Sequence, residues 1–294
     1  MNTKSIIKLC RPNQWVKNLF VMLPLFFSGN ILNGQLAIDA LVALLSFCLA
    51  SSAIYCLNDY IDADADRQHP IKCHRPVASG EIGKSTCILL MSVLSLASVG
   101  ILFVLPTSSM QNSAIVIGAY LVMNYAYCFN LKRVALVDVV IISIGFVLRV
   151  VIGGTSTSIF ISHWIIIMTF LLALFLSLSK RRDDIMLFQQ TGKKMRHNID
   201  RYNLEFMNQA TTLVATVMLV SYIMYTVSPE VVMRFNSNLV YVSSIFVLIG
   251  LLRYIQLAVV FTNSGSPTRI LLRDRFIQLC LMGWIMTFAL IIYF

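Results

Sequence analysis

Residues 36–66 read Leu-Ala-Ile-Asp-Ala-Leu-Val-Ala-Leu-Leu-Ser-Phe-Cys-Leu-Ala-Ser-Ser-Ala-Ile-Tyr-Cys-Leu-Asn-Asp-Tyr-Ile-Asp-Ala-Asp-Ala-Asp. The predominantly apolar run 36–57 is long enough to cross a bilayer as a helix, which takes about 20 residues. Four acids follow within 59–66, where such a helix would leave the membrane. Crowded carboxylates repel one another unless a cation holds them. The stretch therefore predicts a membrane helix that ends in a charged site.

The whole chain has the composition of a membrane protein. Of its 294 residues 58% are hydrophobic and 12% are charged, and the mean hydropathy is +0.79. Soluble domains carry about 25% charged residues. Because apolar runs recur along the chain, we predict an all-α polytopic membrane protein, a bundle with a cytoplasmic-side active-site cavity. About nine transmembrane helices are expected, at roughly 19–33, 36–57, 86–106, 114–130, 135–153, 161–179, 209–228, 238–262 and 276–294.

The two longest charged connections, 58–85 and 180–208, hold equivalent places in the series of spans. This spacing predicts a single integral membrane domain over 1–294 that contains two repeats, about 19–130 and 135–262. The last helix, 276–294, would follow the second repeat.

Basic residues gather on one side of these spans. With the N-terminus in the cytoplasm, twenty of the 23 Lys and Arg fall in cytoplasmic segments. Such asymmetry is typical of multi-pass proteins of the inner (cytoplasmic) membrane. We expect a cytoplasmic N-terminus, an extracytoplasmic C-terminus and an active site that faces the cytoplasm. The net charge of +10 then reflects topology and contact with the bilayer, and no nucleic-acid partner is expected. The sequence does not predict an oligomeric state.

If the helix of the second span continues through Asp66, three of the acids share one face. At about 100° per residue, Asp62 and Asp66 lie within about 60° of Asp59, Asn58 extends that face, and Asp64 points away. Mg²⁺ is held by one or two carboxylates together with phosphate oxygens and water. We therefore predict that Asn58, Asp59, Asp62 and Asp66 bind Mg²⁺ and that the three aspartates are catalytic. The alternative is a solvated helix end, although acids at a helix C-terminus oppose the macrodipole.

Basic side chains after the acids suit the phosphates of an anion bound to that cation. They are Arg67, Lys72 and Arg75. A second charged cluster closes the sixth span and comprises Lys180, Arg181 and Asp184. Topogenic charge is the alternative for the first set, and membrane anchoring is the alternative for the second. The chain has no Walker loop, so an ATP-driven pump is not supported.

Asn58 to Asp66 fits the pattern NDxxDxxxD and resembles the signature of the UbiA superfamily of intramembrane prenyltransferases. Four further motifs resemble one branch of it, the polyprenyl-phosphate phosphoribosyltransferases. They are Arg11-Pro-x-Gln14-Trp15-x-Lys17-Asn18, Asp66-Arg67-x-His69-Pro70-x-Lys72-x-x-Arg75-Pro76, Gly145-Phe-Val-Leu-Arg149-Val and Lys180-Arg181-x-x-Asp184. The second DxxxD of prenyl-diphosphate-using members is missing, because Asp183 and Asp184 are adjacent.

The resemblance implies Mg²⁺-dependent transfer of 5-phosphoribose from phosphoribosyl pyrophosphate to a long-chain polyprenyl phosphate, for cell-envelope polysaccharide synthesis. It also implies two sets of phosphate-binding residues. The donor would be held by Asn58, Arg67, Lys72, Arg75, Lys180, Arg181 and Asp184. The lipid phosphate would be held by Lys17, Lys132, Lys180 and Arg181.

Two other functions remain open from the sequence. One is a UbiA-type prenyltransferase that moves a polyprenyl group from its diphosphate to an aromatic or quinone-precursor acceptor. The missing DxxxD argues against this function. The other, more distant, is an ion or anion transporter, which would place charges deep within several spans.

Overall fold

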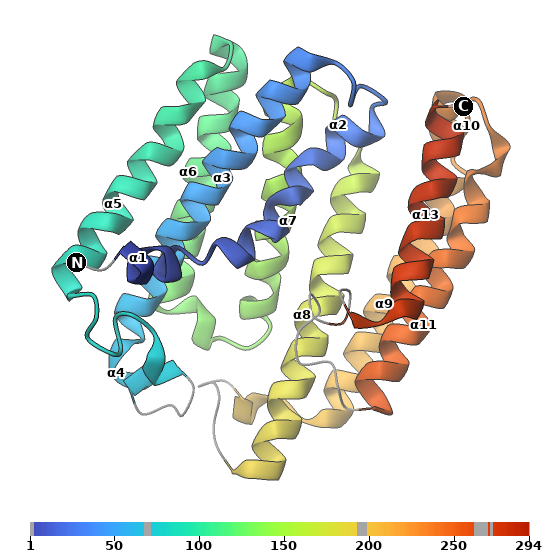
Figure 1. Cartoon of the computed structure of the whole chain (residues 1–294). Coiled ribbons are helices and arrows are strands. Elements are labelled where there is room, and N and C mark those ends of the chain that lie inside the picture. The colour runs from blue at the N-terminus through green and yellow to red at the C-terminus, as the bar shows by residue number, and fades with distance from the viewer. Residues whose placement is uncertain (1–2, 68–71, 193–198, 262–269, 271–272, 294) are drawn as a thin grey trace. The chain divides into compact units, whose positions relative to one another are not determined.

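A computed structural model describes residues 3–67, 72–192, 199–261, 270 and 273–293, and within these ranges the secondary structure is helical (Figure 1). The chain divides into two compact units. The first comprises Met1–Lys132 and Ile144–Ser162, and the second comprises Arg133–Ser143 and His163–Phe294. The all-α class is as predicted. The two predicted repeats stay a prediction.

The first unit is built around the long helix α3. Its elements are α1 (Thr3–Cys10), the 3-10 segment η1 (Pro12–Met22), α2 (Leu23–Phe27), α3 (Gly34–Ile61), α4 (Ala63–Arg67), η2 (Lys72–His74), α5 (Lys84–Gly100), η3 (Ile101–Val104), α6 (Thr107–Phe129), η4 (Leu131–Arg133) up to Lys132, and the later part of α7 (Val137–Thr157). Helix α3 packs against η1, α5 and α6 (Figure 1). Small residues along α3 let these neighbours approach closely, and the Ser46 hydroxyl donates to the Ser98 carbonyl at 2.6 Å.

The second unit contains the early part of α7 and six further helical elements before the last helix. They are α8 (His163–Thr191), η5 (Ile199–Arg201), α9 (Leu204–Thr226), α10 (Pro229–Phe235), η6 (Asn238–Ser243), α11 (Ser244–Val259) and, last, α13 (Arg275–Tyr293). Helix α8 packs along α9, and α11 packs along α13 (Figure 1). Phe175, Met218 and Tyr254 are buried between these helices.

Seven helices in the described ranges are long and apolar enough to cross a membrane, and Arg275–Ile291 forms a shorter apolar helix. These eight correspond to the predicted spans from 36–57 onward. The segment of the first predicted span, 19–33, is not one long helix. It lies partly in η1 and partly in the five-residue α2, and Pro24, which has no backbone N–H to donate, stands where the second element begins. The count of nine spans stays a prediction.

Helix α8 runs on to Thr191, beyond the predicted span end at 179. The charged cluster at 180–184 is therefore helical, and the helix geometry determines which way each of its side chains points.

Gly153 lies on α7 where the backbone of η1 comes closest. A Cβ added there would stand 2.0 Å from the Val21 carbonyl oxygen. A backbone atom cannot rotate away as a side chain does, so Gly153→Ala should lower the free energy of unfolding by about 1–3 kcal/mol. The measurement is thermal unfolding in detergent. Gly118→Ala on α6 is the matched control, because nothing lies within 4 Å of its added Cβ. Equal stability of the two variants would contradict the close contact.

Candidate active site

Two buried aspartates of the first unit share one arginine. Asp59, in the last turn of α3, has a side chain only 1% exposed, and Asp66 on α4 is also buried. Arg75 donates to Asp59 Oδ1 at 3.2 Å and to Asp66 Oδ2 at 2.7 Å. Arg11, between α1 and η1, forms a second ion pair with the same oxygen of Asp59. The acids are thus held by cations from two distant segments.

The predicted continuation of the helix through Asp66 is interrupted at one residue. Asp62 is the C-cap of α3, and α4 begins at the next residue. The Asp62 N–H still donates to the Asn58 carbonyl at 2.9 Å, and the Asp66 N–H donates to the Asp62 carbonyl at 2.8 Å. These helical hydrogen bonds keep the backbone from Asn58 to Asp66 close to a continuous helix. Just after η2, the Arg75 N–H donates to the Lys72 carbonyl at 2.9 Å. This turn positions Arg75, the arginine that contacts Asp59 and Asp66.

Asp62 has a different partner and a different environment. Lys132 of η4 donates to Asp62 Oδ1 at 2.5 Å, across 70 residues of chain. The Asp62 side chain is 32% exposed, far more than that of Asp59. Lys132 was predicted as a ligand of the lipid phosphate, and the structure places it beside the acids. A bound phosphate could compete with Asp62 for this ammonium group.

The acids offer part of a magnesium site. Asp59 Oδ2 is buried and has no hydrogen-bond partner, so it is an acceptor available to a cation. Among the described residues, no three or more His, Cys, Asp and Glu side chains are placed to hold one ion together. Mg²⁺ needs only one or two carboxylates when substrate phosphates and water complete its shell. The residues therefore fit an ion that arrives with a phosphorylated substrate, and the full set of Asn58, Asp59, Asp62 and Asp66 stays a prediction.

Other predicted phosphate-binding residues of the first unit lie on different segments. Arg67 donates to Asp64 at 2.5 Å and to the Ala78 carbonyl at 3.2 Å, and none of its described hydrogen bonds reaches Asp59, Asp62 or Asp66. Lys17 lies in η1 and Lys72 in η2, and both are partly buried.

The second charged cluster is centred on a buried arginine of the second unit. Arg181 donates to Asp138 at 2.8 Å and to Asp184 at 2.9 Å, and its side chain is 4% exposed. The Tyr202 hydroxyl donates to Asp138 at 3.2 Å and accepts from the Leu136 N–H at 2.5 Å. Burial raises the pKa of Tyr202, so this tyrosine stays a neutral donor. Lys180, by contrast, is exposed.

Sequence reasoning left three of these contacting residues out of the site: Arg11, Asp138 and Tyr202. Arg11 stands in the first motif of the resemblance, which was the available signal. Asp138 and Tyr202 gave no local signal, because each meets its partner only through the packing of α7, α8 and the segment before α9.

Removing Arg181 should weaken the second unit strongly. Arg181→Met leaves Asp138, which is 0% exposed, without its ionic partner. Breaking a buried pair from one side costs about 3–5 kcal/mol of unfolding free energy. The check is the unfolding midpoint in detergent, with Lys180→Met as the matched control at the exposed neighbouring position. If both variants unfold alike, the ion pair does not stabilise this unit.

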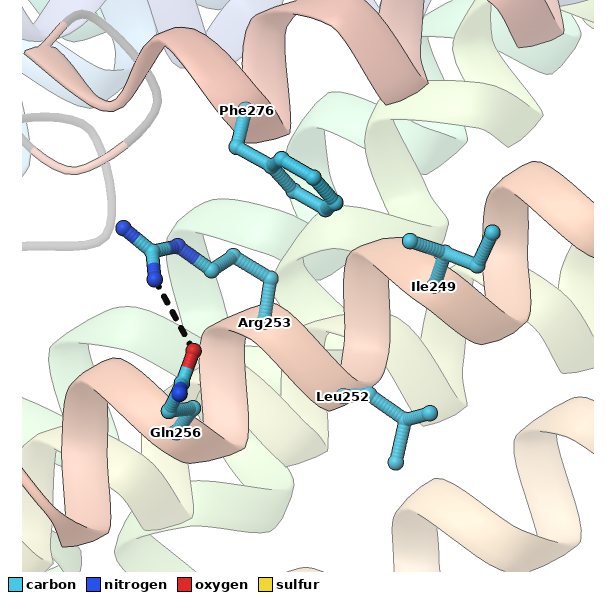
Figure 2. Close-up of a pocket in the computed structure, with 5 residues that line it drawn as sticks. All are labelled: Ile249, Leu252, Arg253, Gln256 and Phe276. Atoms are coloured by element: carbon cyan, nitrogen blue, oxygen red, sulfur yellow. Dashed lines mark hydrogen bonds between the residues drawn. The ribbon is translucent and has the colours of Figure 1, made fainter.

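One cavity in the second unit contains no predicted site residue. It has a volume of about 430 Å³ and is lined by Ile249, Leu252, Arg253, Gln256 and Phe276 (Figure 2). Arg253 donates to Gln256 Oε1 at 2.8 Å, as Figure 2 shows, and to Asp274 at 2.8 Å. The hydrogen bond from Arg253 holds the pKa of Asp274 below its usual value, so this pair is internally neutral. The predicted cytoplasmic-side cavity over the acids stays a prediction.

The fold and the charged clusters define a multi-span, all-helical membrane protein in which acids near helix ends pair with arginine and lysine. The sequence profile of the UbiA prenyltransferase family matches residues 21–279. The chain belongs to that family.

Curated relatives match nearly the whole chain. A decaprenyl-phosphate phosphoribosyltransferase of Mycolicibacterium smegmatis is 34% identical over 99% of this chain and 93% of its own length. One of Corynebacterium glutamicum is 31% identical over 98% of this chain and 87% of its own length. Among solved structures, a UbiA homolog from Archaeoglobus fulgidus bound to DMAPP and Mg²⁺ superposes with a TM-score of 0.70 at 17% identity, covering 98% of this chain and 99% of the other. That likeness establishes the fold.

Proposed function

We propose that this chain transfers 5-phosphoribose from phosphoribosyl pyrophosphate to a long-chain polyprenyl phosphate. The products are polyprenyl-phosphoryl-5-phosphoribose and pyrophosphate, which makes the protein an enzyme of the pentosyltransferase type. The observation that carries this is the full-length match to curated phosphoribosyltransferases at 31–34% identity. The cluster of acids and cations in the first unit supplies groups that suit a pyrophosphate donor.

Donor binding is assigned to the cluster around Asp59. The unpartnered Oδ2 of Asp59, with Asp62, Asp66 and Asn58, would hold Mg²⁺. The ion, when bound, neutralises charge on the pyrophosphate. Arg75 already lies against two of the acids. It would share its remaining N–H groups with phosphate oxygens, as the fork of a guanidinium allows. Arg67 and Lys72 would add charge on the same side.

The motif Lys180-Arg181-x-x-Asp184 assigns phosphate binding to the second cluster as well. Arg181 is held by Asp138 and Asp184, which fixes the guanidinium in one orientation. Lys180 and Arg181 would contact the donor or the acceptor phosphate, and Asp184 would keep Arg181 in place.

In the transfer step the bond between ribose C1 and the pyrophosphate oxygen breaks. A new bond forms between C1 and an oxygen of the lipid phosphate. A phosphate monoester is anionic near neutral pH, so the attacking oxygen needs no strong general base. Cations at Lys17, Lys132, Lys180 and Arg181 would orient the lipid phosphate, and the leaving pyrophosphate departs with its negative charge compensated.

The setting is the inner membrane, with the N-terminus and the acids on the cytoplasmic side, where soluble phosphoribosyl pyrophosphate is available. The support is the distribution of basic residues across the spans. The product would feed cell-envelope polysaccharide synthesis.

The test is a donor comparison with the purified full-length protein in detergent and Mg²⁺. Phosphoribosyl pyrophosphate labelled in the ribose and a polyprenyl phosphate should yield a labelled lipid. A parallel reaction receives a labelled prenyl diphosphate and an aromatic acid. Label that enters lipid only in the parallel reaction would overturn the proposal in favour of prenyl transfer.

A further inference from the structure

A second cavity of the second unit has a buried arginine in its lining. It has a volume of about 260 Å³ and lies between α8, α9 and α11. Its lining residues are Ser179, Arg182, Asn208, Thr211, Thr212, Ile255, Ala258 and Val259. Arg182 is only 5% exposed, although its place after the sixth predicted span is typical of a surface anchor. Burial of this cation inside a cavity therefore calls for a counter-charge.

No carboxylate in the described part of the chain pairs with Arg182. Its Nε donates to Asn208 Oδ1 at 2.7 Å, and Nη1 donates to the Ala258 carbonyl at 2.6 Å and to the Met186 sulfur at 3.0 Å. All three partners are neutral. The second terminal nitrogen, Nη2, has no hydrogen bond within the described residues, so the guanidinium keeps two N–H donors and a full positive charge.

Two further donors stand in the same cavity. Because Arg182 can only donate, the oxygen of Asn208 must face it, and this leaves the amide NH₂ of Asn208 for another acceptor. The hydroxyl of Thr211 is buried and has no hydrogen-bond partner, with the residue 7% exposed. If Arg182 served only to join three helices, the Asn208 amide and the Thr211 hydroxyl would not need to be without acceptors beside it.

We propose that this cavity binds a phosphate group. Phosphate offers several acceptor oxygens and a negative charge, which match the guanidinium, amide and hydroxyl donors of three residues that line one cavity. The volume lies just below the range of about 300–1,000 Å³ typical of sites that enclose a small molecule, so the cavity suits a headgroup and not a whole lipid.

The walls favour a phosphate that belongs to a lipid. Ile255, Ala258 and Val259 make one side apolar, and Val259 is 44% exposed. A chain attached to the phosphate could leave past this side along the outer faces of α9 and α11. Free inorganic phosphate would use the donors but not the apolar wall. The site differs from the Arg181 cluster, whose guanidinium is paired with Asp138 and Asp184.

Native mass spectrometry of the full-length protein in detergent tests this by counting bound molecules, with inorganic phosphate, geranyl phosphate and geraniol as probes. Thr211→Val removes a hydroxyl that has no partner, so folding should be unaffected while affinity for geranyl phosphate falls about tenfold. Arg182→Lys should weaken binding further, since it loses the planar fork. Thr216→Val is the matched control on α9, because its hydroxyl bonds the Thr212 carbonyl and is not part of the cavity lining. It should bind like the wild type.

Geranyl phosphate that binds at least about tenfold more tightly than inorganic phosphate would support the lipid source. Equal binding of the two would support a site for soluble phosphate. Geraniol binding as well as geranyl phosphate, or unchanged binding in both Thr211→Val and Arg182→Lys, would overturn the inference. The readout needs no turnover, so a failure of the proposed transfer reaction would leave it standing.

Discussion

Asp62→Ala should lower the rate of phosphoribosyl transfer by at least about 10²-fold while the protein stays folded. Loss of one group that stabilises charge at a reacting centre costs about 10²–10³ in rate. The Asp62 side chain is 32% exposed and, among the described residues, pairs with Lys132, so the variant loses one ion pair at the edge of the fold and no core packing. The measurement is transfer of labelled ribose at millimolar Mg²⁺, together with the thermal unfolding midpoint of the variant.

The neighbouring acid gives a matched control. Asp64 lies two residues further on, in α4, but its side chain is 76% exposed and it pairs with Arg67 at the surface. Asp64→Ala should keep activity within about twofold, because exposed pairs contribute little. If Asp62→Ala retains wild-type turnover, Asp62 has no place in the donor site. Equal losses in both variants would point to a general effect of charge at this helix end.

Removal of divalent metal should have a comparably large effect. Protein treated with EDTA should transfer ribose at no more than about 1% of the rate with Mg²⁺, because a pyrophosphate leaving group needs its charge compensated. Addition of Mg²⁺ in excess of the chelator should restore the rate. The assay is the same labelled-lipid reaction.

The variant Asp59→Asn tests whether Asp59 contributes to the Mg²⁺ requirement. Asp59→Asn keeps the shape of the side chain and removes the charge beside the unpartnered oxygen. It should raise the Mg²⁺ concentration needed for half-maximal rate by about tenfold or more, since metal affinity depends on charged ligands. Full activity in EDTA would show that the reaction needs no divalent metal. An unchanged Mg²⁺ requirement in Asp59→Asn would show that Asp59 does not bind the metal.

Much of the fold could be predicted because hydrophobic length determines which segments can cross a bilayer. The span 36–57 became α3, and the runs after it became helices of similar extent. The first predicted span was harder, because hydropathy does not measure backbone continuity. Pro24 near the start of α2 helps divide an apolar segment into two short elements.

The site could be predicted only where its chemistry was local. The spacing of Asp59, Asp62 and Asp66 predicted that they share one helix face, and each forms an ion pair with a basic side chain in the structure. Their role in catalysis stays a prediction. Which cation meets which acid depends on packing between distant segments, as the Lys132 contact with Asp62 illustrates. Burial is also a tertiary property. Arg182 looked like an anchor in the sequence, and the structure encloses it in a cavity.

Mass spectrometry of the lipid product distinguishes phosphoribosyl transfer from prenyl transfer. Purified wild-type protein would receive one polyprenyl phosphate of known length and Mg²⁺, with and without phosphoribosyl pyrophosphate. We expect a lipid heavier than the acceptor by one phosphoribosyl group, formed only when the donor is present and absent with Asp62→Ala. An unchanged acceptor in the complete reaction, with a prenylated product formed from prenyl diphosphate and an aromatic acid, would contradict it.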